Sequence, residues 1–344
     1  MDTTPEALYT HSDTAQSSSG QPPTPPPSTL RKLFLGADGL RAGWSLLIFI
    51  AIAFSLGFGV NFILRKLGAP QKPGSEISPL LGIAGEGSSF LLILLVVWIM
   101  SKIERRPNRV YGLGDSRMLP HFIAGLASGI LCLSALIVTL LKTGLLVIDH
   151  RLIFGSDIVR YGTIWLIGFL MVGLLEEYLT RGYVQYTLTR GLAGIYEWAF
   201  KTRHSAALGF WTSALIFSIL FGLGHGKNPG ESPIGLLSAG LVGMVFCLSL
   251  WRTGSLWWAI GFHTSWDWGQ SFLYGVADSG MMAQHRFLAT HPVGKPILSG
   301  GSTGPEGSIF ILAVLAIVAL IIVFTLPRTS EDYASKLPTH RREA

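Results

Sequence analysis

Charged residues are scarce in this sequence. Asp, Glu, Lys and Arg together make up 13% of the 344 residues, whereas a soluble domain usually carries about 25%. Hydrophobic residues make up 49%, and the mean hydropathy of the chain is +0.47. This balance excludes an ordinary soluble domain and indicates a membrane protein. The formal net charge of +6 does not indicate nucleic-acid binding, because the positive residues flank apolar segments and no nucleic-acid-binding motif stands out.

Cysteine is equally rare. The two cysteines, Cys132 and Cys247, both lie inside apolar runs, which excludes a disulfide framework and a cysteine-based zinc site. The sequence contains no Asn-x-Ser/Thr glycosylation acceptor, and its first thirty residues contain no apolar core like that of a secretory signal peptide. These absences favour a bacterial plasma (inner) membrane as the location of the protein.

The common motifs of soluble enzymes are missing as well. There is no His-Glu-x-x-His pair of a standard zinc protease and no Gly-x-Ser-x-Gly turn of a serine hydrolase. Gly222, Gly224 and Gly226 are not followed by the Lys-Ser/Thr of a phosphate-binding loop. The sequence therefore gives no support to a soluble hydrolase or to a nucleotide-binding fold.

Long apolar runs dominate what remains. A helix of about 20 residues crosses the ~30 Å hydrocarbon core of a bilayer, and eight runs meet or nearly meet that length. They cover residues 44–64, 79–100, 122–141, a run that begins near residue 161, and then 206–223, 234–250, 256–274 and 309–326. These runs predict an all-α, polytopic membrane helix bundle of about eight transmembrane helices.

Eight membrane helices place both termini on the same side of the membrane. When the loops are assigned by alternation, 17 Lys and Arg residues fall on the side of the termini and 9 on the other. By the positive-inside rule, we expect both termini to be cytoplasmic.

Composition divides the chain into five parts. The first is rich in Pro, Ser and Thr, cannot bury a core and is expected to be a disordered tail. The fourth is rich in Gly, Ser and Pro and is either a flexible external loop or a lid. In order, the parts are the tail at 1–30, membrane helices one to three at 31–160, a membrane core with the polar motifs at 161–275, the long loop at 276–306, and the last membrane helix with a basic C-terminal tail at 307–344.

Two adjacent acids and an arginine interrupt the fourth apolar run. Glu176, Glu177 and Arg181 lie in or near the bilayer, where each charge costs at least ~2.5–3.5 kcal/mol and marks a functional site by default. Glu177 and Arg181 are four residues apart on one helix face, so we expect an ion pair between them. Glu176 points roughly 100° away, which leaves it without that partner and free for chemistry.

Two further polar motifs lie on later runs. His225 ends the fifth run one turn after Phe221, whose ring is placed to wall off the imidazole. His263 and Asp267 lie on the seventh run at i, i+4 spacing and face the same way. Each motif alone has a structural explanation, such as a hydrogen bond between helices. Together, on three helices, they indicate one buried site that serves an ion path, a metal or catalysis.

These motifs, in this order, resemble the CAAX prenyl endopeptidase and bacteriocin-processing (CPBP, or Abi) family of intramembrane proteases. The resemblance covers about residues 160–275. It rests on Glu176-Glu177-x-x-x-Arg181, Phe221-x-x-x-His225 and His263-x-x-x-Asp267, and on the flanks Arg181-Gly182-Tyr183 and Thr253-Gly254-Ser255-Leu256-Trp257.

The resemblance implies an all-helical enzyme that hydrolyses peptide bonds of a membrane-associated peptide or protein. Glu176 and His225 match the pair that activates water, and His263 and Asp267 match the residues that complete the site. The remaining motif residues, Glu177, Arg181 and Phe221, are expected to support it. Two alternatives stay open for the cofactor: none, or one divalent metal held by Glu176, His225, His263 and Asp267, with zinc the best match to such ligands.

Position 267 carries a second ambiguity, because members of the family have Asn or Asp there. Asn can donate a hydrogen bond to an oxyanion, whereas an ionised Asp cannot. Asp267 is therefore protonated, or orients His263, or ligates a cation.

Two other functions fit the same polar residues. An ion-coupled membrane transporter also uses acids and histidines within the bilayer, although no inverted repeat is evident. A catalytically silent membrane scaffold is the other, although no motif position is lost. Whether the substrate is of the CAAX type or of the bacteriocin type is left open, as is the oligomeric state.

Residue counting raises one geometric difficulty for a shared site. With cytoplasmic termini, Glu176 falls in the cytoplasmic half of its helix and His225 falls nearer the outer face. At 1.5 Å rise per residue, the axial mismatch between them is on the order of 10 Å.

Overall fold

The computed structural model describes residues 29–36, 38–66 and 76–326. These residues are predominantly helical, which confirms the all-α membrane bundle expected from the apolar runs. The expected tail at 1–30 lies almost wholly outside the described residues, and the C-terminal tail from residue 327 onward lies outside them too.

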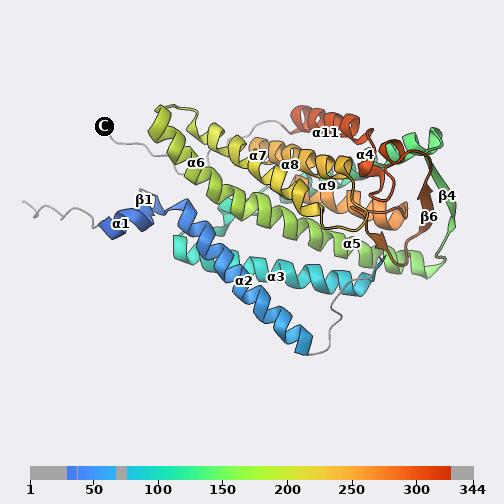
Figure 1. The fold of residues 1–344 in the computed structure, drawn as a ribbon, viewed down its shortest axis with the longest axis horizontal. Helices are drawn as coiled ribbons and strands as arrows, with labels where there is room; N and C mark the ends of the chain where they lie inside the picture. The colour runs from blue at the N-terminus through green and yellow to red at the C-terminus, as the bar shows by residue number, and fades with distance from the viewer. Residues whose placement is uncertain (1–28, 37, 67–75, 327–344) are drawn as a thin grey trace, which may run out of the picture.

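The helices and strands follow one another along the chain as shown in Figure 1. The α-helices of the described residues are α1 (Thr29–Phe34), α2 (Ala42–Lys66), α3 (Pro79–Glu104), α4 (Met118–Lys142), α5 (Ser156–Glu177), α6 (Gln185–Phe200), α7 (Ser205–His225), α8 (Pro233–Thr253), α9 (Trp257–Asp267), α10 (Pro296–Ser299) and α11 (Ile311–Thr325). The 3₁₀ turns are η1 (Asn108–Tyr111) and η4 (Pro305–Gly307), and the π-helical turns are η2 (Tyr178–Val184) and η3 (Trp268–Leu273). The short strands are β1 (Leu35–Gly36), β2 (Gly39–Leu40), β3 (Glu76–Ile77), β4 (Leu146–Arg151), β5 (Met282–Ala283) and β6 (Leu288–Pro292).

Each of the eight apolar runs coincides with a helix. By length and composition, six helical stretches of the described chain can cross a membrane: α2, α3, α4, the stretch Ser156–Phe200, α7 and α8. The remaining two runs form α9 with η3, and α11, which are shorter. A bundle of about eight membrane helices is therefore consistent with the fold.

The helix that carries the paired acids is longer than the sequence indicated. α5, η2 and α6 form one continuous helical rod from Ser156 to Phe200. The rod widens into a π-helical turn at Tyr178, directly after Glu177. The other π-helical turn begins at Trp268, directly after Asp267. Such turns are rare and often lie at functional sites, and here each follows an acid of a polar motif.

The rod also explains how distant motifs meet. After Phe200 the chain turns, and α7 packs back along α6, with α8 beside α7 (Figure 1). His225, the last residue of α7, therefore returns along the rod toward the paired acids. The axial mismatch expected between Glu176 and His225 does not arise, because α6 extends the rod by 16 residues before the chain reverses.

Glycines allow α4 to lie unusually close to α9. A Cβ atom at Gly125 would collide with the carbonyl oxygen of Trp258, and one at Gly129 would collide with the Ser265 hydroxyl. Gly261 makes the reciprocal approach to the carbonyl of Phe122. Small residues at such positions let membrane helices pack backbone to backbone. This packing sets the position of α9, which carries two of the polar residues.

The segment between η3 and α11 folds into a cover at one end of the bundle. β5 pairs in parallel with β3, and β6 pairs antiparallel with β4. The β4–β6 pair lies at the right of Figure 1. Ser279, Met281 and Met282 of this segment line the cavity described below. The long loop expected at 276–306 thus contains its own short strands and turns.

Candidate active site

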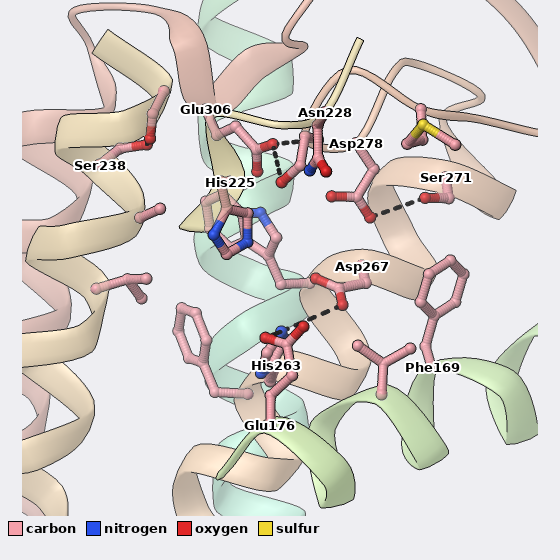
Figure 2. Close-up of a pocket in the computed structure, with 18 of the residues that line it drawn as sticks. Phe169, Glu176, His225, Asn228, Ser238, His263, Asp267, Ser271, Asp278 and Glu306 are labelled. Carbon is pink, nitrogen blue, oxygen red and sulfur yellow. Dashed lines mark hydrogen bonds and ion pairs between the residues drawn. The ribbon is translucent and has the colours of Figure 1, made fainter. Parts of the chain in front are cut away.

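One cavity of about 270 Å³ collects the polar residues of the second half of the chain (Figure 2). Side chains of α3, α5, α7, α8, α9 and α11 form its wall, and the segment after η3 covers it. Its polar lining consists of Glu86, Glu176, His225, Asn228, Ser238, His263, Asp267, Ser271, Asp278, Ser279 and Glu306. All four residues expected to carry the chemistry therefore line the same cavity.

Glu177 and Arg181 form a buried ion pair beside the cavity. The Arg181 Nη1 atom donates to Glu177 Oε1 over 2.7 Å, as their i, i+4 spacing predicts. The two side chains are 3% and 0% exposed, respectively. A charge so far from water is tolerated only with a partner, so each residue depends on the other.

His263 is held by that ion pair. Its Nδ1 lies 3.1 Å from the same Glu177 Oε1 atom that Arg181 contacts. Since an ionised carboxylate only accepts hydrogen bonds, Nδ1 carries the proton and donates it. The other nitrogen, Nε2, lies 3.4 Å from Asp267 Oδ2 and 3.8 Å from Glu176 Oε2. The ring thus connects the buried ion pair to the two acids of the cavity.

Glu176 differs from its neighbour in the way the sequence indicates. Its side chain is 32% exposed, and it faces the cavity. Among the described residues, its Oε2 atom has no hydrogen-bond partner, although that atom is buried. Glu176 is therefore the acid of the pair that is available to a ligand in the cavity.

His225 enters the cavity from another helix. Its Nδ1 lies 2.8 Å from the carbonyl oxygen of Phe221, to which it can only donate. This bond fixes the tautomer and leaves Nε2 as an acceptor. Figure 2 shows the rings and carboxylates of His225, Glu176 and Asp267 directed into the same space. Within the described chain, His225 forms no ion pair with a carboxylate, so its accepting nitrogen is free.

Among the polar lining residues that the sequence motifs do not contain are an amide and two acids from outside the long helices. Asn228 follows α7, and Asp278 and Glu306 belong to the cover; all three line the cavity (Figure 2). Asp278 Oδ2 accepts a hydrogen bond of 2.9 Å from the Ser271 hydroxyl. Glu306 accepts bonds from the backbone nitrogen and the hydroxyl of Ser279. No motif or helical spacing in the sequence connects these loop residues to the site.

The buried carboxyl of Asp278 predicts that the stability of the protein depends on pH. Burial raises the pKa of its carboxyl well above the usual range, and the charges of Asp267 and Glu306 raise it further. Above about pH 4, the folded protein therefore binds more protons than the unfolded chain, and its stability falls as the pH rises. We expect Asp278→Asn, whose amide oxygen can still accept from Ser271, to raise the thermal midpoint at about pH 8 and to change it little at about pH 4.

Thermal unfolding of both proteins across this pH range measures the effect. Asp157→Asn, at an exposed acid near the start of α5, is the matched control and should follow the wild type. A gap between Asp278→Asn and wild type that stays constant with pH, or that shrinks as the pH rises, would contradict the assignment.

The residues expected to ligate a metal do not form a coordination shell. Within residues 29–36, 38–66 and 76–326, no group of three or more His, Cys, Asp and Glu side chains is arranged to hold a metal ion. The Nδ1 atoms of both histidines are engaged, by Glu177 and by the Phe221 carbonyl, which leaves Nε2 of each ring toward the cavity. Metal analysis of the purified active protein distinguishes the two alternatives, one zinc ion or no cofactor.

Comparison with known proteins identifies the segment that carries the site. A family model described as type II CAAX prenyl endopeptidase Rce1-like matches residues 159–269, about a third of the chain. The matched segment includes all three polar motifs and ends two residues after Asp267. This match confirms the resemblance to the CPBP family. No curated protein and no solved structure matches the chain.

Proposed function

From the Rce1-like segment and the cavity that it lines, we propose that this protein is an intramembrane endopeptidase. It would hydrolyse a peptide bond of a membrane-associated substrate with water activated by Glu176 and His225. The description of the matched family makes a prenylated peptide with a C-terminal CAAX sequence the first substrate to test.

One observation carries the proposal. Glu176, whose Oε2 atom accepts no hydrogen bond from the described residues, and His225, with its accepting nitrogen, come from different helices and line one cavity. Amide hydrolysis needs a base for the attacking water and a proton donor for the leaving nitrogen. Two acceptors that face a shared, largely apolar space provide a position for that water.

The residues have separate roles in the proposed reaction. The Glu176 carboxylate takes one proton from water while His225 Nε2 accepts a hydrogen bond from the other hydrogen. The water oxygen then bonds to the carbonyl carbon. Protonated Glu176 passes its proton to the leaving nitrogen as the C–N bond breaks, which restores the carboxylate.

His263 and Asp267 would complete the site. A proton on His263 Nε2 would donate to the oxyanion that forms on the carbonyl oxygen, the charge that such sites stabilise most strongly. Glu177 holds the opposite side of that ring through Nδ1. Asp267, 3.4 Å from Nε2, would orient the imidazole, which is the second of the three roles considered for this position.

Purified full-length protein in detergent tests the function directly. We expect a prenylated CAAX peptide to be cut at one bond, detected by mass spectrometry, and the same peptide without its prenyl group to be cut more slowly. The opposite result is folded protein that cuts neither peptide and instead drives ion-dependent solute uptake into liposomes. That result would show that the protein is a transporter and not a protease.

A further inference from the structure

Arg181 has more partners than charge neutralisation requires. Besides its bond to Glu177, its guanidinium lies 4.5 Å from the centre of the Phe221 ring and 5.5 Å from the centre of the Phe246 ring. Both distances are within the range of cation–π attraction. The cation is therefore enclosed by one carboxylate and two aromatic rings, a group that we call the arginine cage (Arg181, Glu177, Phe221 and Phe246).

The three cage residues around Arg181 each lie against an imidazole of the cavity. The Phe221 ring centre lies 4.7 Å from that of His225. The Phe246 ring centre lies 5.9 Å from that of His263, and Glu177 accepts the bond from His263 Nδ1. One guanidinium thus reaches both histidines through intermediate side chains, although the histidines lie on α7 and α9.

His225 needs such support because of its place in the fold. It is the last residue of α7, and its neighbours Gly224 and Gly226 offer no side chains to restrain it. The hydrogen bond from Nδ1 fixes one end of the ring, and the face of Phe221 limits rotation of the rest. The ring of Phe221 is in turn held by the cation of Arg181.

We propose that Arg181 is a positioning residue for both imidazoles, orienting His263 through Glu177 and Phe246 and orienting His225 through Phe221. This proposal rests on the proposed function for its effect on turnover, because the two imidazoles are placed there in the reaction. The orientation of the two rings by Arg181 follows from the contacts of the cage and does not depend on the proposed function. If Arg181 only neutralised Glu177, replacing Arg181 would not move the His225 ring. Phe221 would then affect that ring through packing alone.

The test compares Phe221→Leu with Phe217→Leu. Phe217 lies one turn earlier on α7 and contributes neither to the cavity lining nor to the cage. In the peptide assay, Phe221→Leu should lower kcat by roughly tenfold to a hundredfold with little change in KM, since small misplacements of reacting groups have effects of that size. Phe221→Tyr, which keeps the ring, should recover most of the loss, and Phe217→Leu should match the wild type.

Side-chain NMR of histidine-labelled protein gives a readout that needs no turnover. Phe221→Leu should shift the ring signals of His225 but not those of His263. Phe246→Leu should shift the signals of His263 but not those of His225. Arg181→Lys should shift the signals of both rings. Equal spectra and equal kcat for Phe221→Leu and Phe217→Leu would overturn the positioning role. If the wild-type protein cuts no peptide but the variants show these shifts, the proposed function is refuted and the positioning role of Arg181 is retained.

Discussion

Glu176→Gln is expected to lower kcat by about 10²–10⁴-fold, the range that a positioned general base contributes. The amide keeps the size of the side chain but cannot take a proton from water. Because Glu176 faces the cavity and forms no hydrogen bond through Oε2, its replacement should leave the fold intact. The measurement is the rate of peptide cleavage in detergent, together with the thermal midpoint of each protein.

A control on the same rod separates chemistry from charge. Glu197→Gln, in α6 and away from the cavity, removes one carboxylate from the protein without touching the site. It should cleave at the wild-type rate. Wild-type activity in Glu176→Gln would remove this residue from the mechanism.

Arg181→Ala is expected to lower the free energy of unfolding by about 3–5 kcal/mol, the usual cost of removing one partner of a buried ion pair. The substitution leaves the carboxylate of Glu177 without its cation at a position that water does not reach. It also removes the group between the Phe221 and Phe246 rings. Chemical denaturation in detergent measures the change.

Two comparisons sharpen this prediction. Arg203→Ala, at an exposed arginine beyond the end of α6, should change stability by no more than about 0.5 kcal/mol. Combining Arg181→Met with Glu177→Gln should recover part of the stability, since neither charge is then left alone. A loss below about 1 kcal/mol in Arg181→Ala would show that the pair is not buried as described.

Local spacing explains why the sequence predicted parts of the site. Glu177 with Arg181 and His263 with Asp267 are each four residues apart on a helix, so their contacts follow from helical geometry alone. The difference between Glu176 and Glu177 follows in the same way, because adjacent residues on a helix diverge by roughly 100°.

Contacts between elements could not be predicted in this way. The bond between His263 and Glu177 joins residues 86 positions apart in the chain, and no spacing rule connects them. The apolar run that begins near residue 161 did not show that the rod continues to Phe200, because the run ends at polar residues, whereas the helix passes through a π-helical turn there without ending. That continuation is what returns His225 to the acids.

The cover was the least predictable part. Its glycines and prolines show no periodicity, so the register of the β3–β5 and β4–β6 pairs could not be predicted. Asp278 and Glu306 therefore reached the cavity without any sequence signal. Their contribution depends on how the cover folds back over the helices.

The central claim is that Glu176 and His225 act on one water molecule, and a double-mutant comparison of kcat tests it most directly. We expect Glu176→Gln, His225→Gln and the combined variant to lose nearly the same factor in peptide cleavage, because residues that act as a unit are strongly non-additive. Losses that multiply in the combined variant would show that the two residues act independently, and the shared-water mechanism would be wrong.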